Sequence, residues 1–273
     1  MKKLTNHTLV YDSDCPMCDL YTRGFIKAGM LDENGRVEYG RARVPVTFDN
    51  ARARDEIALV DYNTGTVSYG IDSLLRVIGH SFPVLAPLFK FPLFRHPVAV
   101  LYKFVSYNRK VIAPARVFEK RGSCTPSYHA GYRIAYIIFA WLICSLILGG
   151  YSPLLQPLIP GSDFYREFVI CGGQIAFQLV FVRLVTKDKL LHYIGNMMTV
   201  SLIGSLLLLP MMIVARVVPM SSSSPWMPAV WFSCVVCFML FEHSRRVKRL
   251  GIPWQVTLTW VAYRFLILWI ILV

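Results

Sequence analysis

The sequence predicts a small α/β domain at the N-terminus, followed by an all-α transmembrane helical bundle of about five spans. Hydrophobic residues make up 55% of the chain and the mean hydropathy is +0.47, which is too apolar for an ordinary soluble protein. Residues 1–80 carry many charges, whereas long apolar runs dominate residues 134–273. We therefore expect a soluble head over residues 1–125 and a membrane body over residues 126–273.

A strand, a Cys-Pro-Met-Cys turn and a helix follow one another in the head. Thr8–Tyr11 is apolar and β-prone, which predicts a buried strand. Pro16 takes the first position of a helical pattern that extends to about residue 29. Because a helix start stabilises a thiolate, Cys15 and Cys18 are predicted to form a redox-active dithiol. The alternatives are two unrelated thiols or half of a zinc site, but zinc needs a second Cys or His pair, which this region lacks.

The cysteines and aspartates of this turn have distinct expected roles. Cys15 lies at the start of the helix, where we expect it to be exposed and to act as the nucleophile, while Cys18 resolves the mixed disulfide. Asp12 and Asp14 oppose the helix dipole, because a nearby carboxylate favours the thiol over the thiolate. Each aspartate either shuttles a proton or caps the helix; capping is favoured for Asp12, and both roles stay open for Asp14. Two cations farther along the helix are expected to offset this negative charge: Arg23 and Lys27.

The rest of the head alternates between strand and helix patterns. We expect a second strand, a partly helical connection, a β-hairpin and a helix, at residues 37–40, 49–55, 56–69 and 71–78. The order β-α-β-(α)-β-β-α matches a thioredoxin-like arrangement. Thioredoxins place a cis-proline just before the hairpin, whereas this sequence has Arg54 and Asp55 there.

Three motifs of the head resemble the DCC family of thiol-disulfide oxidoreductase-like proteins, which is named for an Asp-Cys-x-x-Cys core. They lie at Val10–Cys18, Val67–Leu75 and Tyr102–Arg109, and the resemblance covers about residues 6–125. It implies a thioredoxin-like fold and dithiol chemistry without a further cofactor. It also implies that the partners are protein or small-molecule thiols and disulfides. The resemblance does not extend to the membrane body.

Residues 81–110 are apolar but contain prolines at 83, 87, 92 and 97, with Lys90, Arg95 and Lys103 spaced along them. This composition argues against a membrane-spanning helix. We expect short helices that lie on the head or in the membrane interface, with the cations reaching toward water.

The membrane body contains five apolar segments close to the roughly 20 residues that a bilayer core requires. They lie at about residues 133–150, 167–186, 190–215, 226–243 and 253–273. Lys and Arg concentrate before the first span, between the second and third, and between the fourth and fifth. By the positive-inside rule, the head is cytoplasmic and the C-terminus lies outside a plasma or inner membrane. This placement accounts for much of the net charge of +13, so we expect a lipid bilayer rather than nucleic acid as the partner.

Polar residues inside the spans are candidate sites. Arg264 lies near the middle of the last span, where an ionised group is costly. We expect it to contact Gln174, Gln178, backbone carbonyls or an anionic ligand, or to snorkel to the outer surface. His192 and Asn196 share a helix face, and His243 lies at a similar depth. The two histidines either bind metal, relay protons or anchor the spans at the interface.

A second Cys-x-x-Cys, formed by Cys234 and Cys237, lies within the fourth span. In a regular helix their Cβ atoms are about 5–6 Å apart, farther than a disulfide allows. We therefore favour two cysteines that fill a helix interface over a second dithiol.

The leading hypothesis is an integral-membrane thiol-disulfide oxidoreductase whose dithiol needs neither a metal nor a cofactor. One alternative is a membrane scaffold or transporter whose head only senses redox state. Another is a membrane protein that handles copper or zinc through histidines and methionines of the spans.

Overall fold

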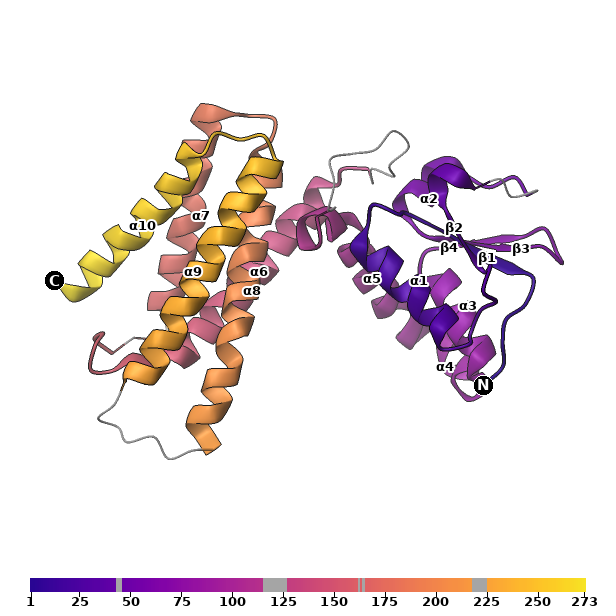
Figure 1. Ribbon diagram of the computed structural model, residues 1–273, viewed down its shortest axis with the longest axis horizontal. Helices are drawn as coiled ribbons and strands as arrows, with labels where there is room; N and C mark the ends of the chain where they lie inside the picture. The colour runs from indigo at the N-terminus through magenta and orange to yellow at the C-terminus, as the bar shows by residue number, and fades with distance from the viewer. Residues whose placement is uncertain (43–45, 115–126, 162, 164, 218–224) are drawn as a thin grey trace. The chain divides into compact units, whose positions relative to one another are not determined.

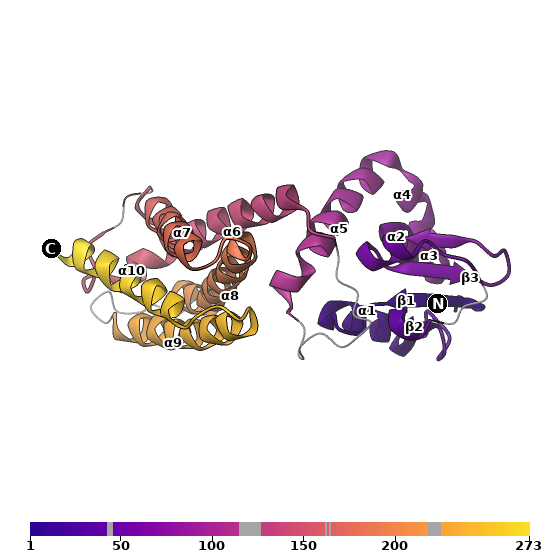
Figure 2. The same ribbon diagram turned by 90° about the horizontal axis from the view of Figure 1, so that it is seen from above.

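The computed structural model describes residues 1–42, 46–114, 127–161, 163, 165–217 and 225–273. The chain divides into two compact units, Met1–Tyr132 and Arg133–Val273 (Figures 1 and 2). Each unit has hydrophobic packing of its own. The expected boundary between residues 125 and 126 lies outside the described residues.

A mixed sheet of four strands forms the centre of the first unit. Its strands are β1 (His7–Tyr11), β2 (Arg36–Glu38), β3 (Ala58–Asp61) and β4 (Val67–Tyr69), in the order β2-β1-β3-β4. β1 pairs with β2 in parallel and with β3 antiparallel, and β3 pairs antiparallel with β4. The strand patterns therefore predicted the sheet correctly, although β2 ends at Glu38 because a 3₁₀ turn, Tyr39–Arg41, follows it.

Both faces of the sheet are buried, because the side chains of β1 alternate between two cores. Leu9 packs in one core with α1 (Pro16–Lys27) and α3 (Ile71–Ser81), whereas Val10 packs in the other with α2 (Asn50–Asp55). Figure 2 shows these helices around the sheet. The central strand β1 is buried along its whole length, so the turn that follows it leaves from a rigid element.

The segment after α3 differs from the expectation of short helices. It contains the 3₁₀ turn Pro83–Leu85, α4 (Ala86–Lys90) and α5 (Pro92–Ile112), and α5 is a single helix of 21 residues. Pro97 lies inside α5, where it removes only one backbone hydrogen bond near the helix start. The C-terminal half of α5 is held in place because Ser106, Asn108, Arg109 and Val111 are buried in the head.

Among its described residues, the membrane body contains five helices that are long and apolar enough to span a membrane, as the sequence predicts. They are α6 (Ala130–Tyr151), α7 (Arg166–Val185), α8 (Leu190–Val217), α9 (Trp226–Arg249) and α10 (Gln255–Leu272); a 3₁₀ turn, Ser152–Leu155, follows α6. These helices indicate a membrane protein. α8 supplies much of the core of the bundle, including Tyr193, Ile194 and Met197.

Gly70 offers a test of the packing between the sheet and α5. Its φ of +62° and ψ of −133° lie in a region that essentially only glycine adopts. A Cβ atom there would lie 2.8 Å from the Glu56 carboxylate and 3.2 Å from the Tyr102 ring. Gly65 also has a positive φ, of +68°, but a Cβ atom would have no neighbour within 4 Å.

We expect Gly70→Ala to lower the free energy of unfolding of the head by about 1–3 kcal/mol more than Gly65→Ala, because only Gly70 adds overpacking to backbone strain. The full-length protein in detergent is titrated with urea, and unfolding of the head is followed by thiol labelling of the buried Cys15 and Cys18. Equal losses in the two variants would show that Gly70 is not closely packed.

Candidate functional site

The structure places both cysteines of the dithiol at the turn between β1 and α1. The Cys15 amide donates to the carbonyl of Asp12 at 3.2 Å, which closes the turn. Cys15 is the N-cap residue of α1, and its Sγ accepts the backbone N–H of Cys18 at 3.4 Å. Pro16 takes the first helical position, where a missing N–H costs nothing. The helix start therefore directs an amide donor at the Cys15 sulfur.

The two sulfurs differ in acidity. The pKa of Cys15 is lowered from its ordinary 9.0 to about 7, first because the Cys18 thiol donates a hydrogen bond to it. The backbone N–H of Cys18 and the charge of Arg109 act in the same direction, whereas burial and Asp12 oppose them. The pKa of Cys18 is raised, first by this hydrogen bond and then by burial. Cys15 is therefore the sulfur that ionises first, which fits a nucleophile.

The dithiol is buried, contrary to the expectation that Cys15 is exposed. Cys15 is 5% exposed and Cys18 is 7% exposed. Both belong to the hydrophobic core on one face of the sheet, where Tyr21 and Tyr102 also pack. The expectation failed because a position at a helix start is open only when no other element covers it. A reacting partner must reach Cys15 through a local opening of this core.

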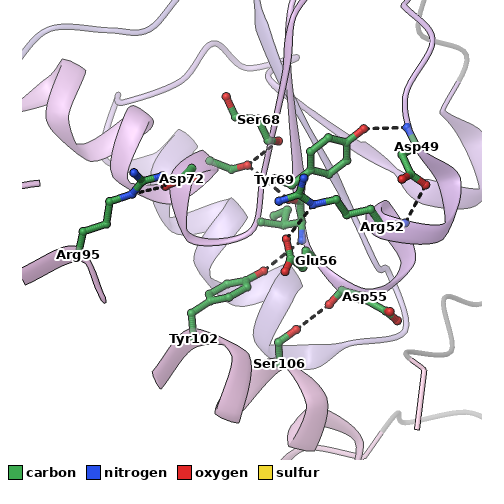
Figure 3. Close-up of polar contacts among 12 residues, drawn as sticks. Asp49, Arg52, Asp55, Glu56, Ser68, Tyr69, Asp72, Arg95, Tyr102 and Ser106 are labelled. Atoms are coloured by element: carbon green, nitrogen blue, oxygen red, sulfur yellow. Dashed lines mark hydrogen bonds and ion pairs between the residues drawn. The ribbon is translucent and has the colours of Figure 1, made fainter. Parts of the chain in front are cut away.

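A buried ion pair lies beside the dithiol. The Nη2 of Arg109, on α5, lies 3.3 Å from the Oδ2 of Asp12, and both side chains are nearly inaccessible. Arg109 also donates to the carbonyls of Arg54 at 2.9 Å and Asp55 at 3.2 Å. The Ser106 hydroxyl donates to the same Asp55 carbonyl at 2.7 Å, as Figure 3 shows. The guanidinium thus joins α5, the end of α2 and the dithiol turn.

The positive charge beside Asp12 and the dithiol comes from Arg109, whereas the sequence pointed to Arg23 and Lys27. Arg23 pairs with Asp19 at 2.9 Å on the surface of α1, and Lys27 is exposed at its end. A surface pair is screened by water, whereas a buried guanidinium acts at short range in a less polar medium. Among the cations, it is Arg109, 97 residues beyond Asp12, that lowers the pKa of Cys15, and a partial contribution of Arg23 and Lys27 stays a prediction.

Neither aspartate caps α1, because Cys15 holds that position. The Oδ1 of Asp12 instead accepts the backbone N–H of Asp14 at 3.1 Å, inside the turn. Burial raises the pKa of the Asp12 carboxyl, and the Arg109 charge opposes this rise. Asp12 thus orients the turn and binds Arg109. A proton-shuttle role for Asp14 stays a prediction.

Two tyrosines complete the surroundings of the dithiol and were not singled out from the sequence as site residues. The pKa of Tyr21 is raised, first by burial and then by the neighbouring Cys18. The hydroxyl of Tyr102, on α5, accepts the backbone N–H of Ile57 at 3.1 Å. Tyr102 and Arg109 both belong to the third motif quoted above, which was the available signal for their part in the site.

In the membrane body, His243 belongs to a polar cluster that connects four helices. The Tyr193 hydroxyl lies 3.0 Å from its Nε2 and donates to Gln178 at 2.9 Å. The Thr257 hydroxyl lies 3.3 Å from the Nδ1, and the ring stacks on Trp260 at 4.7 Å. Both nitrogens of His243 are thus engaged, which leaves neither free for a metal. Within the described ranges, no three His, Cys, Asp or Glu side chains are grouped to hold a metal ion.

Asn196 and His192 belong to another set of contacts on α8. The Asn196 side chain donates to the His192 carbonyl at 2.9 Å and accepts from the Arg246 guanidinium at 3.0 Å. Arg246 also binds Glu242 at 2.7 Å, and all three polar side chains of this contact are buried. Asn196 therefore anchors α8 to α9 through Arg246.

The two remaining candidates in the spans are Arg264 and the pair formed by Cys234 and Cys237. The Arg264 guanidinium lies 4.0 Å over the Trp260 ring, a cation–π contact, while Gln178 is bound by Tyr193 and Thr259. Cys234 and Cys237 are free and exposed on the outer surface of α9. Among the described helices of this chain they fill no interface, because α9 packs on α8 through another face, with Val235 and Met239.

A comparison of the chain with protein families, curated proteins and solved structures finds no match in any of the three. The candidate site therefore rests on its own geometry and chemistry.

We expect Cys18→Ala to raise the pKa of Cys15 toward its ordinary 9.0, because the variant removes the thiol donor. Cys18→Ser is the matched control: its hydroxyl still donates, so the rise should be smaller. Asp12→Asn should lower the pKa of Cys15, because it removes a negative charge. The measurement is the rate of Cys15 alkylation against pH in the full-length reduced protein, with mass mapping of the product. An unchanged midpoint in Cys18→Ala would contradict the assigned hydrogen bond.

Proposed function

We propose that the protein is a membrane-anchored thiol-disulfide oxidoreductase of the DCC type, with a thioredoxin-like head. The observation that carries the proposal is the Cys15 sulfur at the N-cap of α1, with a pKa lowered to about 7 and a second thiol one turn away. A thiolate at neutral pH and an adjacent resolving thiol are the requirements for disulfide exchange.

The topology of the head supports a thioredoxin-like fold. The dithiol follows the first strand, α1 connects the parallel pair β1 and β2, and an antiparallel hairpin, β3–β4, precedes α3. The order β-α-β-α-β-β-α agrees with the expected arrangement. The three quoted motifs also meet in space, since Gly70 lies against Tyr102 and Arg109 binds Asp12.

Thioredoxins have a cis-proline just before the hairpin, whereas this protein has Arg54 and Asp55 at that position. The carbonyls of Arg54 and Asp55, just before the hairpin, accept hydrogen bonds from Arg109. These two carbonyls are therefore bound by the Arg109 guanidinium and are not free to bind an extended substrate. We infer that a substrate reaches Cys15 by another route.

Disulfide exchange would proceed in two steps. The Cys15 thiolate attacks one sulfur of a substrate disulfide, forms a mixed disulfide and releases the other sulfur as a thiolate. Cys18 then loses its proton and attacks Cys15, which releases the second substrate thiol. The substrate gains two electrons and the protein is left with a Cys15–Cys18 disulfide. Two donor thiols, or one donor dithiol, reduce it by the reverse sequence and become a disulfide themselves.

The distribution of basic residues supports a cytoplasmic head. Arg183, Lys187 and Lys189 lie around the connection between α7 and α8, and four cations lie at the end of α9: Arg245, Arg246, Lys248 and Arg249. Cytoplasmic loops carry such an excess of Lys and Arg. A reducing compartment also suits a dithiol that is oxidised only during turnover.

Turnover tests the proposal directly. We expect Cys15→Ala to abolish reduction of a small disulfide substrate by the full-length protein, because no sulfur remains to attack. Cys18→Ser should accumulate the mixed disulfide at Cys15, since the resolving thiol is missing. The measurements are the rate of thiol release and the mass of the trapped adduct.

The double variant Cys234→Ser/Cys237→Ser is the control. Its cysteines lie on the outside of α9, so turnover should stay within about twofold of wild type, under roughly 0.4 kcal/mol on the transition-state scale. Unchanged turnover in Cys15→Ala would exclude the proposed enzyme and favour a head that only senses redox state or binds a partner.

The orientation gives a separate prediction. A cysteine introduced at the exposed Lys27 should react with an impermeant maleimide only after the membrane is permeabilised, whereas a tag after Val273 should be accessible in intact cells. Accessibility of both markers from one side would indicate a sixth crossing. The helix pair Pro83–Lys90 and Pro92–Ile112 is the candidate for it, because together these helices are apolar enough to span.

A further inference from the structure

A cavity of about 390 Å³ lies on the head, and neither cysteine of the dithiol lines it. It is lined by residues of α2, β4, α3, α4 and α5, and Tyr102 contributes to its wall. Four cations line it: Arg52, Lys90, Arg95 and Lys103. The concentration of positive charge in one hollow is the feature that needs an explanation.

Acidic residues balance only half of this charge. Arg95 binds both carboxylate oxygens of Asp72 at 2.8 Å, and Arg52 lies 3.3 Å from Glu56, as Figure 3 shows. Lys90 and Lys103 have no acidic partner among the residues that the structure describes. The two lysines leave the cavity with an uncompensated positive charge, which favours an anionic ligand.

Large apolar side chains are exposed on the segment that carries these lysines. Val84 is 89% exposed, Phe91 is 55% exposed and Leu93 is 77% exposed. They lie around the corner between α4 and α5, where the chain bends by 87°. Exposed apolar side chains beside lysines are typical of segments that lie in a membrane interface.

We propose that the cavity binds the phosphate headgroup of an anionic phospholipid while the α4–α5 corner inserts Phe91 and Leu93 into the membrane interface. The complementary charges of the lysines and the phosphate would hold the headgroup, and the apolar corner would contact the acyl chains. The five membrane-length helices keep the head of the same chain close to a bilayer. The lining of the cavity does not include Cys15 or Cys18, and the proposal does not depend on the proposed redox activity.

The test uses hydrogen–deuterium exchange of the full-length protein in lipid nanodiscs. One set of discs contains phosphatidylcholine alone, and the other contains equal parts of phosphatidylcholine and phosphatidylglycerol. Peptides that cover residues 82–105 should exchange more slowly in the discs with phosphatidylglycerol. The exchange of β1 and β3 in the same sample reports whether the head is folded.

Two variants separate the parts of the proposal. Lys90→Gln/Lys103→Gln should weaken the docking equilibrium in anionic discs by about 30-fold, equivalent to about 1 kcal/mol for each lysine at an anionic surface. The double variant Phe91→Ser/Leu93→Ser should also lose the slower exchange of residues 82–105, because its α4–α5 corner no longer inserts into the membrane interface. The matched control Lys2→Gln/Lys27→Gln removes two exposed lysines outside the cavity and should behave like wild type.

Three outcomes would overturn the proposal. Equal protection in both kinds of disc would show that no anionic headgroup is recognised. Equal loss in the control variant would show that only the net charge of the head matters. Protection of residues 82–105 by glycerol 3-phosphate in phosphatidylcholine discs would assign the cavity to a soluble phosphate ester instead of a lipid.

Discussion

The buried Arg109–Asp12 pair is the interaction on which the organisation of the head depends. Burying a charge costs several kcal/mol unless a partner and further hydrogen bonds compensate for it. Arg109 meets this condition through Asp12 and the carbonyls of Arg54 and Asp55, which belong to two separate parts of the chain. The C-terminal half of α5 must therefore dock at the dithiol turn, because any other position would leave a charge and two carbonyls without partners.

α5 also connects the two candidate binding regions of the head. Its C-terminal half carries Arg109 beside the dithiol, while Arg95 and Lys103 line the cavity. Tyr102 takes part in both regions, since its ring lines the cavity and packs against the core that contains Cys15 and Cys18. A ligand that moves this helix would therefore alter the surroundings of the sulfurs.

The membrane body satisfies its buried polar groups mainly within the bundle. His243, Tyr193, Gln178 and Thr257 bind one another across four helices, and Arg246 joins Glu242 to Asn196. Such contacts specify which helix faces meet, because unpaired polar groups are expensive in a bilayer. The cysteines of α9 lie outside this network and are exposed.

The sequence by itself determined the features that depend on local pattern and composition. Short apolar, β-prone runs predicted the strands, the Pro16 position predicted the start of α1, and hydropathy predicted the five long apolar helices. Only the tertiary structure decided the burial of Cys15, the partner of Asp12 and the outward position of Cys234 and Cys237. These features depend on contacts between distant segments, and a local pattern cannot say which face of a helix another element will cover. The third motif pointed to Arg109, but its role followed only from the packing of α5 against the dithiol turn.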